Sequence, residues 1–386
     1  MHIPFLKPPY DDAEIEAVER VMRTANLSYG PEVNRFESEF ADYIGVKYAV
    51  AVNSGTSALE LTLQALIHTG RIDHGAGVII PSFTFVAVAN AVVNAGLKPV
   101  FADISPTTMN IDPDNIILEY DIPVRAIIPV HTFGMPCDMY EIVDFANKHG
   151  LVVIEDCAEA LGSMDAGYMV GSLADCGIFS FTATKNMTTG EGGMITTNNT
   201  ELVEVLRLLR EHGIPQRVGT DARAAILPGH NYRMSNILAA IGLVQLRKIN
   251  MLNCARNNNS AILSTLIEKH NLPVTVPETS PNRTYQLYTV QLMNTDERWS
   301  ATLEERDMVQ AGLQCRGVDA KVYFYPPIHQ QTYYRNNNFY CSPTGMATTE
   351  AVAERVISLP MYPGLSHDEL EYMADSLAES VKEVMG

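Results

Sequence analysis

Short runs of apolar, β-forming residues recur through the first two hundred residues, and they constrain the fold more than any other feature of this sequence. Several of them, such as Val78-Ile79-Ile80 and Leu151-Val152-Val153-Ile154, show no alternation between apolar and polar residues. Strands of this kind are buried on both faces, as in a mostly parallel sheet covered by helices, so the predicted fold class is α/β. The predicted strands are Tyr48–Val52, Gly77–Ile80, Pro99–Ala102, Ala126–Val130, Leu151–Ile154, Gly177–Phe181 and Met194–Thr197.

The pattern changes near residue 250. A long amphipathic helix over Ser235–Asn250 ends the alternation, a second helix follows near Ala255–His270, and the asparagines 257–259 indicate a short turn. We therefore predict a large domain over residues 1–250, which includes an N-terminal arm, and a smaller C-terminal α+β domain over residues 251–386. The elements predicted for the smaller domain are strand-like Tyr285–Leu292 and Val322–Tyr325 and helices over Leu303–Cys315, Thr348–Ile357 and Ser366–Val384.

The N-terminal region predicts a helix that Asp11 or Asp12 caps. Ile15, Val18 and Met22 lie on one face of this helix, because residues three and four apart are neighbours on a helix surface.

The charge balance restricts the partners of the protein. Asp and Glu number 45 against 27 Lys and Arg, a formal net charge of -18. Such a surface repels the phosphates of nucleic acid and the headgroups of an anionic membrane, so neither is an expected partner. We find no signal peptide and no apolar run of membrane-spanning length. Six scattered cysteines without a C-x-x-C motif indicate free thiols, and hence a reducing cytoplasm.

Lys185 is the first candidate for chemistry. It follows a β run, lies among small hydroxyl residues, and precedes the turn Gly190-Glu191-Gly192-Gly193. A lysine that is desolvated in such a place becomes a nucleophile for a carbonyl, which is the condition for a Schiff base. An exposed loop lysine is the alternative that the local sequence leaves open.

Asp156 strengthens the interpretation of Lys185. It ends a buried strand, and ligands of parallel α/β sheets bind at that edge. A carboxylate there can hold the protonated ring nitrogen of pyridoxal phosphate and maintain that ring as an electron sink. The alternative for Asp156 is a helix N-cap ahead of Ala158.

A phosphate site is predicted where Asn53-Ser54-Gly55-Thr56 leaves a strand and opens a helix. Free helix-start amides and hydroxyl groups bind phosphate, and Ser180 can add a further donor. Phe85 also follows a buried strand, so its ring can stack on a planar cofactor. An ordinary helix cap and a core aromatic residue are the respective alternatives.

Other kinds of site are not predicted. The ten histidines lack the spacing of metal ligands, so we expect no metal. The sequence contains no Walker A loop, no G-x-G-x-x-G motif and no G-x-S-x-G nucleophile elbow.

Over nearly its whole length the chain resembles the DegT/StrS-type nucleotide-sugar aminotransferases. That family uses pyridoxal phosphate and has the aspartate-aminotransferase fold, fold type I, with a mostly parallel seven-stranded sheet in its large domain. The similarity rests on a set of motifs in a fixed order. They are Ile3-Pro4-Phe5, Asn53–Thr56, Pro81–Phe85, Pro129–Gly134, the stretches around Asp156 and Lys185, Gly229–Met234, Tyr325–His329 and Ser358–Leu365.

The resemblance implies a role for each matching residue. Lys185 matches the lysine that binds the cofactor and carries the proton, and Asp156 matches the partner of the ring nitrogen. Phe85 matches the stacking ring, and Asn231 matches a residue that reaches the phosphate in the neighbouring subunit, which implies a homodimer. The remaining matches are the phosphate binders Gly55, Thr56 and Ser180, and the substrate-binding positions Arg233, Tyr325 and His329.

Glu159 marks the branch of the family. Many members carry His or Gln near the phenolic oxygen of the cofactor, and the Glu159 version resembles the branch that acts on 4-keto-6-deoxy sugars, including perosamine synthases. The resemblance therefore implies amino transfer, with L-glutamate as donor, to a nucleotide-linked sugar of that class.

Three alternatives stay open. One is a 3-keto sugar or a cyclitol as the substrate. Another is a sugar dehydratase, which Lys185 disfavours because the related dehydratases carry His at that position. The third is a non-catalytic regulator or scaffold that retains the fold.

Overall fold

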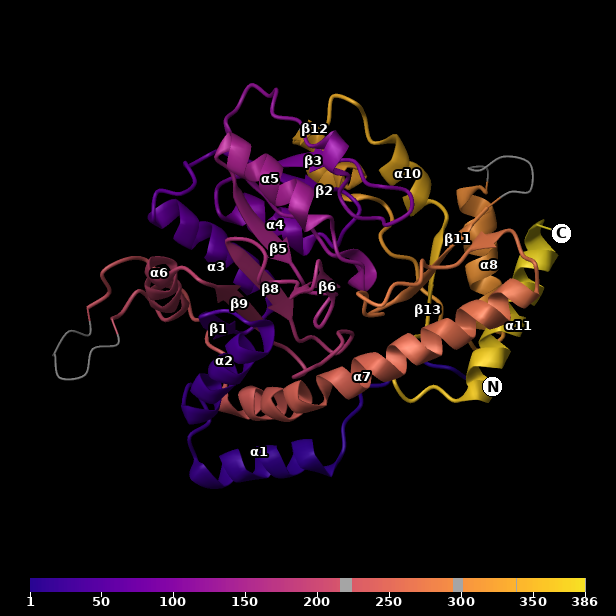
Figure 1. Ribbon diagram of the computed structural model, residues 1–386, viewed down its shortest axis with the longest axis horizontal. Coiled ribbons are helices and arrows are strands. Elements are labelled where there is room, and N and C mark those ends of the chain that lie inside the picture. Colours follow the sequence, from indigo (N-terminus) through magenta and orange to yellow (C-terminus); the bar gives the residue numbers. More distant parts are fainter. Residues whose placement is uncertain (216–223, 294–300, 338, 386) are drawn as a thin grey trace.

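A computed structural model describes residues 1–215, 224–293, 301–337 and 339–385 (Figure 1). Its centre is an eight-stranded sheet with strand order β1-β9-β8-β5-β4-β2-β3-β12, in which β9 alone runs antiparallel to its neighbours. The other neighbours are parallel, as predicted for strands that are apolar on both faces. The bounds are β1 Tyr48–Val52, β2 Gly77–Pro81, β3 Lys98–Ala102, β4 Val124–Ile127, β5 Val152–Asp156, β8 Cys176–Ser180, β9 Gly193–Thr197 and β12 Tyr340–Cys341.

Helices cover both faces of this sheet. One face packs against α3 (Gly55–His68), α4 (Ala87–Asn94) and α6 (Thr200–Arg210). The opposite face packs against α2 (Pro31–Ile44), α5 (Met139–His149) and α7 (Asn236–Lys269). The α/β fold class predicted from the sequence is therefore confirmed. A small hairpin of β6 (Met164–Asp165) and β7 (Tyr168–Met169) follows β5.

A second apolar core forms around a three-stranded antiparallel sheet of order β10-β11-β13. Its strands are β10 Val274–Thr275, β11 Tyr288–Leu292 and β13 Val356–Leu359, and it lies beside α8 (Leu303–Cys315) and α11 (His367–Met385) (Figure 1). The C-terminal part also contributes α9 (Thr332–Asn336), α10 (Ala347–Ala353) and β12, which joins the edge of the large sheet. Seven of the eight strands of that sheet precede residue 250, and the division of the chain at that residue stays a prediction.

Helix α7 is one continuous helix of 34 residues, where the sequence predicted two helices and an asparagine turn. The asparagines remain helical because their side chains are used by the surrounding structure. Asn257 Nδ2 donates to the carbonyl of Arg283 at 3.0 Å, and Asn259 Nδ2 donates to that of Tyr362 at 2.9 Å. The helix thus runs from the large sheet to the small one (Figure 1).

Two further local predictions differ from the structure. Residues 322–325 do not form a strand, because they pair with no neighbouring strand among the described residues. Helix α1 (Asp12–Thr24) is capped by Asp11, as predicted, but it buries Glu14, Ala17 and Val21 against α7 and exposes the face that carries Ile15 and Met22.

Helix α7 contains a stretch that is long and apolar enough to cross a membrane by length and composition alone. Half of that stretch is buried inside the protein, where α7 contacts α1, α2 and α11. Burial of this extent is typical of a core helix in a globular fold, so the stretch is weak evidence for a membrane span.

Candidate active site

A cavity of about 400 Å³ lies at the carboxyl ends of the parallel strands, next to the start of α3. Ligands of open α/β sheets bind at this edge. Two segments from the C-terminal part, at residues 286–287 and 323–324, also line the cavity. The cavity is lined by Ser54, Gly55, Thr56, Leu59, Thr84, Phe85, Ala87, Val88, Val130, Asp156, Ala158, Glu159, Ile178, Ser180, Thr182, Thr184, Lys185, Glu191, Gln286, Leu287, Tyr323 and Phe324.

Lys185 and Glu159 form an ion pair inside this cavity. Nζ of Lys185 lies 3.3 Å from Oε1 of Glu159, and both side chains are largely shielded from solvent. The second carboxylate oxygen of Glu159 accepts the backbone N–H of Phe133 at 2.9 Å. The Lys185 amine therefore lies within the protein, as its candidate role requires, and the carboxylate beside it is held in a fixed orientation.

Asp156 is the last residue of β5 and is buried. Its Oδ1 accepts the N–H of Ala158 at 3.0 Å. Burial raises the pKa of its carboxyl to about 6, although this hydrogen bond and the charge of Lys185 act in the opposite direction. A buried carboxylate that forms no direct ion pair in the described structure is well matched to a cationic ring nitrogen.

The start of α3 has the features of a cradle for a phosphate group. Ser54 caps the helix by accepting the N–H of Ser57 at 3.0 Å, and the first amides of the helix have no partner within the helix. Gly55 lies so close to β8 that a Cβ atom there would fall 2.8 Å from Cβ of Ser180. The absent side chain at Gly55 thus leaves the helix-start amides and the Ser180 hydroxyl open to one small anion.

Phe85 lies at the mouth of the cavity, with 58% of its surface exposed. An exposed aromatic ring beside a polar cavity provides a flat face for a planar ligand. The carboxylate of Asp156, the amine of Lys185, the phosphate cradle and this ring together fit pyridoxal phosphate.

Four predicted site residues do not line the cavity of their own chain. Asn231 is exposed, and Nη1 of Arg233 lies 3.3 Å from a carboxylate oxygen of Glu211. The ring of Tyr325 lies under the guanidinium of Arg306, 5.0 Å from its carbon. Nδ1 of His329 lies 2.7 Å from the Ser82 hydroxyl, and its Nε2 lies 3.1 Å from Glu350. Their roles at the site stay predictions.

Several residues that line the cavity were not predicted from the sequence. Gln286, Leu287, Tyr323 and Phe324 reach the cavity from segments more than one hundred residues after Lys185. Nε2 of Gln286 donates to the carbonyl of Thr184, directly before Lys185, at 2.9 Å. No local pattern marks these positions, because only the contact between the two parts of the chain brings them to the site.

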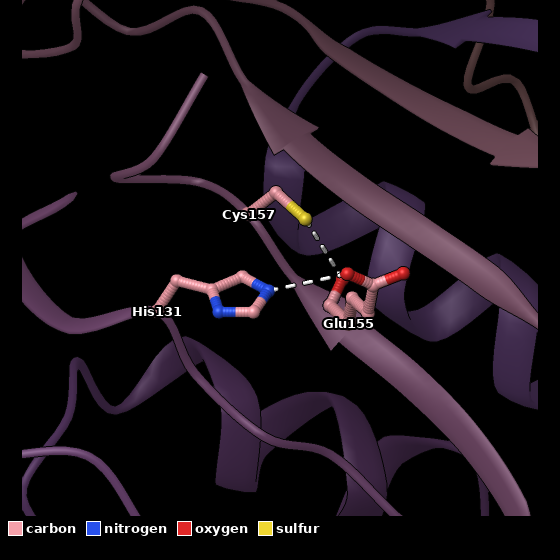
Figure 2. A group of neighbouring side chains, drawn as sticks. All are labelled: His131, Glu155 and Cys157. Atoms are coloured by element: carbon pink, nitrogen blue, oxygen red, sulfur yellow. Dashed lines mark hydrogen bonds and ion pairs between the residues drawn. The ribbon is translucent and has the colours of Figure 1, made fainter. Parts of the chain in front are cut away.

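His131, Glu155 and Cys157 form a buried cluster next to Asp156 (Figure 2). Their ligand atoms lie within 4.8 Å of one another, a spacing that a metal ion can bridge. Nδ1 of His131 accepts the N–H of Cys137 at 2.9 Å, so the ring proton lies on Nε2, which donates to Glu155 at 3.3 Å.

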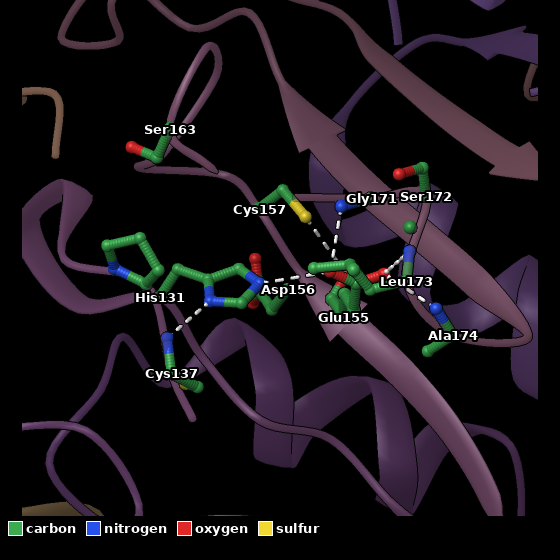
Figure 3. Close-up of polar contacts among 12 residues, drawn as sticks. His131, Cys137, Glu155, Asp156, Cys157, Ser163, Gly171, Ser172, Leu173 and Ala174 are labelled. Carbon is green, nitrogen blue, oxygen red and sulfur yellow. Dashed lines mark hydrogen bonds and ion pairs between the residues drawn. The ribbon is translucent and has the colours of Figure 1, made fainter. Parts of the chain in front are cut away.

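Backbone amides already use both oxygens of Glu155 (Figure 3). These donors lie on the loop after β7, at 2.8 to 3.0 Å, and they are the N–H groups of Gly171, Leu173 and Ala174. A metal ion would have to displace several of these hydrogen bonds. The cluster therefore holds the loop after β7 against β5, the strand that ends in Asp156, and it is a poor metal site.

Comparison with known proteins shows which family the chain belongs to. The chain is 37% identical to the GDP-perosamine synthase of Caulobacter vibrioides over 375 residues, which cover 96% of each chain. Its structure matches that of Helicobacter pylori PseC, an aminotransferase involved in the biosynthesis of pseudoaminic acid, with a TM-score of 0.91, 28% identity and coverage of 99% and 100%. It also matches the PLP-form of Spr1654 from Streptococcus pneumoniae with a TM-score of 0.88, 27% identity and full coverage of both chains.

The family model of the DegT/DnrJ/EryC1/StrS aminotransferase family matches residues 8–378. Pyridoxal phosphate is the cofactor of this family, and the cavity fits it. The chain therefore belongs to the DegT/DnrJ/EryC1/StrS aminotransferase family and is a pyridoxal-phosphate-dependent sugar aminotransferase.

Proposed function

We propose that the protein transfers the amino group of L-glutamate to the keto carbon of a nucleotide-linked 4-keto-6-deoxy sugar, with release of 2-oxoglutarate. The observation that carries the proposal is the placement of Lys185, Glu159 and Asp156 in one cavity. The similarity to GDP-perosamine synthases, at 37% and 31% identity, favours this class of sugar. Biosynthesis of a perosamine-type amino sugar is the corresponding pathway role.

Lys185 is the proposed carrier of the proton. Its amine takes the proton from the amino-bearing carbon of the donor and, in the second half of the cycle, returns a proton to the sugar carbon that gains nitrogen. The contact with Glu159 Oε1 at 3.3 Å supports this role, because it holds the amine inside the cavity without a tight hydrogen bond.

Asp156 is the proposed partner of the ring nitrogen, and the phosphate cradle is assigned to Gly55, Thr56 and Ser180. Bound pyridoxal phosphate supplies an electron sink for the reacting carbon. A cation at the ring nitrogen would keep the Asp156 carboxyl ionised in spite of its burial, so ligand and residue stabilise each other's charged forms. Phe85 covers the ring face.

Glu159 is proposed to lie beside the phenolic oxygen. Like charges repel at that distance, so the carboxylate needs donors of its own. The N–H of Phe133 and the amine of Lys185 provide them, and both contacts support the assignment.

We further propose that the enzyme is a homodimer in which Asn231 of one subunit completes the phosphate site of the other. The charges along the cavity support this. Asp156, Glu159 and Glu191 face it with Lys185 as the single cation among the described lining residues, yet the substrates and cofactor are highly anionic. Asn231 is exposed, and neither it nor Arg233 lines the cavity of its own chain, so both residues are placed where they can contact a second copy. The unpaired cysteines are consistent with work in the cytoplasm.

A panel of keto substrates tests the proposed reaction. The protein is loaded with pyridoxal phosphate and L-glutamate and offered nucleotide-linked 4-keto-6-deoxy sugars, a 3-keto sugar and a keto cyclitol, and the products are measured by mass. The expected result is an amino sugar from the 4-keto class. Amination of the 3-keto sugar or the cyclitol alone would overturn the substrate assignment, loss of water without amination would indicate a dehydratase, and no cofactor binding would favour a scaffold.

A further inference from the structure

Tyr323 reaches the cavity from the segment that follows α8. Its ring packs against Phe5 of the N-terminal arm, with centroids 6.0 Å apart, and against Phe324, with centroids 5.4 Å apart. These contacts hold the ring in place. The residue is half-buried and lines the same cavity as Lys185 and Glu159.

The hydroxyl group of Tyr323 has no hydrogen-bond partner among the described residues of the chain. Burial raises the pKa of this hydroxyl, and the negative charge of Glu159 raises it further. The group therefore stays protonated in neutral solution and is available as a donor. A half-buried donor without a protein partner, on a residue that lines a substrate cavity, is available to a ligand oxygen.

The charge of Glu159 restricts what that oxygen can be. Glu159 and Tyr323 line the same cavity, and the carboxylate raises the pKa of the phenol, so a second anion held beside both groups would be repelled. A neutral oxygen is favoured. Oε1 of Glu159 lies 3.3 Å from the Lys185 amine, so a neutral oxygen held beside Tyr323 and Glu159 would lie in the part of the cavity where Lys185 acts.

We propose that the Tyr323 hydroxyl donates a hydrogen bond to the keto oxygen of the acceptor sugar and so helps the enzyme select a keto sugar. This assignment rests on the proposed function. Tyr323 is a proposed binding residue, and Glu159 and Lys185 line the same cavity.

Binding measurements test the proposal without turnover. The enzyme carries pyridoxal phosphate and receives no amino donor, so a keto sugar binds without reaction. Calorimetry compares the nucleotide-linked 4-keto-6-deoxy sugar with the same nucleotide sugar that lacks oxygen at that carbon. The expected result for Tyr323→Phe is an affinity for the keto sugar about fivefold lower, with unchanged affinity for the deoxy analogue.

The Tyr323→Phe change retains the ring and its contacts with Phe5 and Phe324, so only the hydroxyl is lost. Tyr168→Phe, a loss of the same group from an exposed side chain outside the cavity, serves as the matched control and is expected to bind both ligands as the wild type does. Equal affinity of wild type and Tyr323→Phe for the keto sugar would overturn the proposal, and so would equal weakening of both ligands. Failure of the proposed function is a separate result, since the wild type would then aminate no 4-keto sugar.

Discussion

The acidic residues in the cavity differ in how their negative charge is compensated. Glu159 has the Lys185 amine and a backbone amide beside it, whereas Asp156 is fully buried with one amide donor. The pKa of the Asp156 carboxyl is accordingly raised from 3.8 to about 6. At low pH the carboxyl is neutral, and its burial costs the cofactor-free fold little. As the pH rises from 3.8 through about 6, the buried carboxyl becomes charged and the free energy of unfolding falls.

Asp156→Asn should therefore stabilise the cofactor-free protein. The raised pKa corresponds to a destabilisation of about 3 kcal/mol above pH 7, and to about half of that near pH 5. Urea unfolding of wild type and variant at several pH values measures this difference in the free energy of unfolding. Asp42→Asn, at an exposed position, is the control and should show no such trend. A difference that does not vary with pH would contradict the assignment of the shift to Asp156.

The residues at strand ends could be predicted from the sequence. Asp156 and Ser180 end buried strands, and Gly55 follows one, so the geometry of a parallel sheet brings them to one edge. Gln286 and Tyr323 could not be predicted in this way. Their place at the site depends on how the C-terminal part packs against the large sheet, and no local spacing encodes that contact.

At the scale of elements, the strands followed from their β-branched, apolar runs, since such residues fit a sheet that is covered on both faces. The failures have tertiary causes. The asparagines in α7 are poor helix formers, but their hydrogen bonds to Arg283 and Tyr362 compensate for that. Val322–Tyr325 has strand-forming residues, but the described part of the chain offers it no neighbouring strand to pair with.

The close contact between the start of α3 and β8 predicts that a larger residue at position 55 weakens cofactor binding. Gly55→Ala places a methyl group 2.8 Å from Cβ of Ser180, so the helix start and β8 must separate and the phosphate donors lose their spacing. The dissociation constant for pyridoxal phosphate should rise at least about tenfold, a loss of about 1.4 kcal/mol. Fluorescence titration of the cofactor measures it. Gly364→Ala, where a Cβ meets nothing within 4 Å, should bind the cofactor normally. Unchanged affinity in Gly55→Ala would contradict the assignment of the phosphate site to the start of α3.

In the whole molecule, the large sheet and segments of the C-terminal part enclose the candidate active-site cavity, and the proposed second subunit supplies a further polar residue, Asn231. A test in mixed dimers follows from this arrangement. Lys185→Ala and Asn231→Ala are each expected to have little activity alone, but a mixed dimer contains one intact site if Asn231 acts across the interface. Random mixing should then restore about a quarter of the wild-type rate.

The two variants carry different affinity tags, so mixed dimers can be purified after co-expression. A mixture that is no more active than its components would contradict the exchange of Asn231 between subunits. Dimer formation itself is checked by sedimentation of the wild type.

The proposed reaction depends above all on the Lys185 amine, as nucleophile and as proton carrier. The most direct measurement is the rate of amino-sugar formation from L-glutamate and a nucleotide-linked 4-keto-6-deoxy sugar, followed by mass, in wild type and Lys185→Ala at saturating pyridoxal phosphate. The expected result is a loss of about 10³-fold or more in the variant, since both the nucleophile and the proton carrier are removed. A Lys185→Ala protein that forms the amino sugar at the wild-type rate would contradict it.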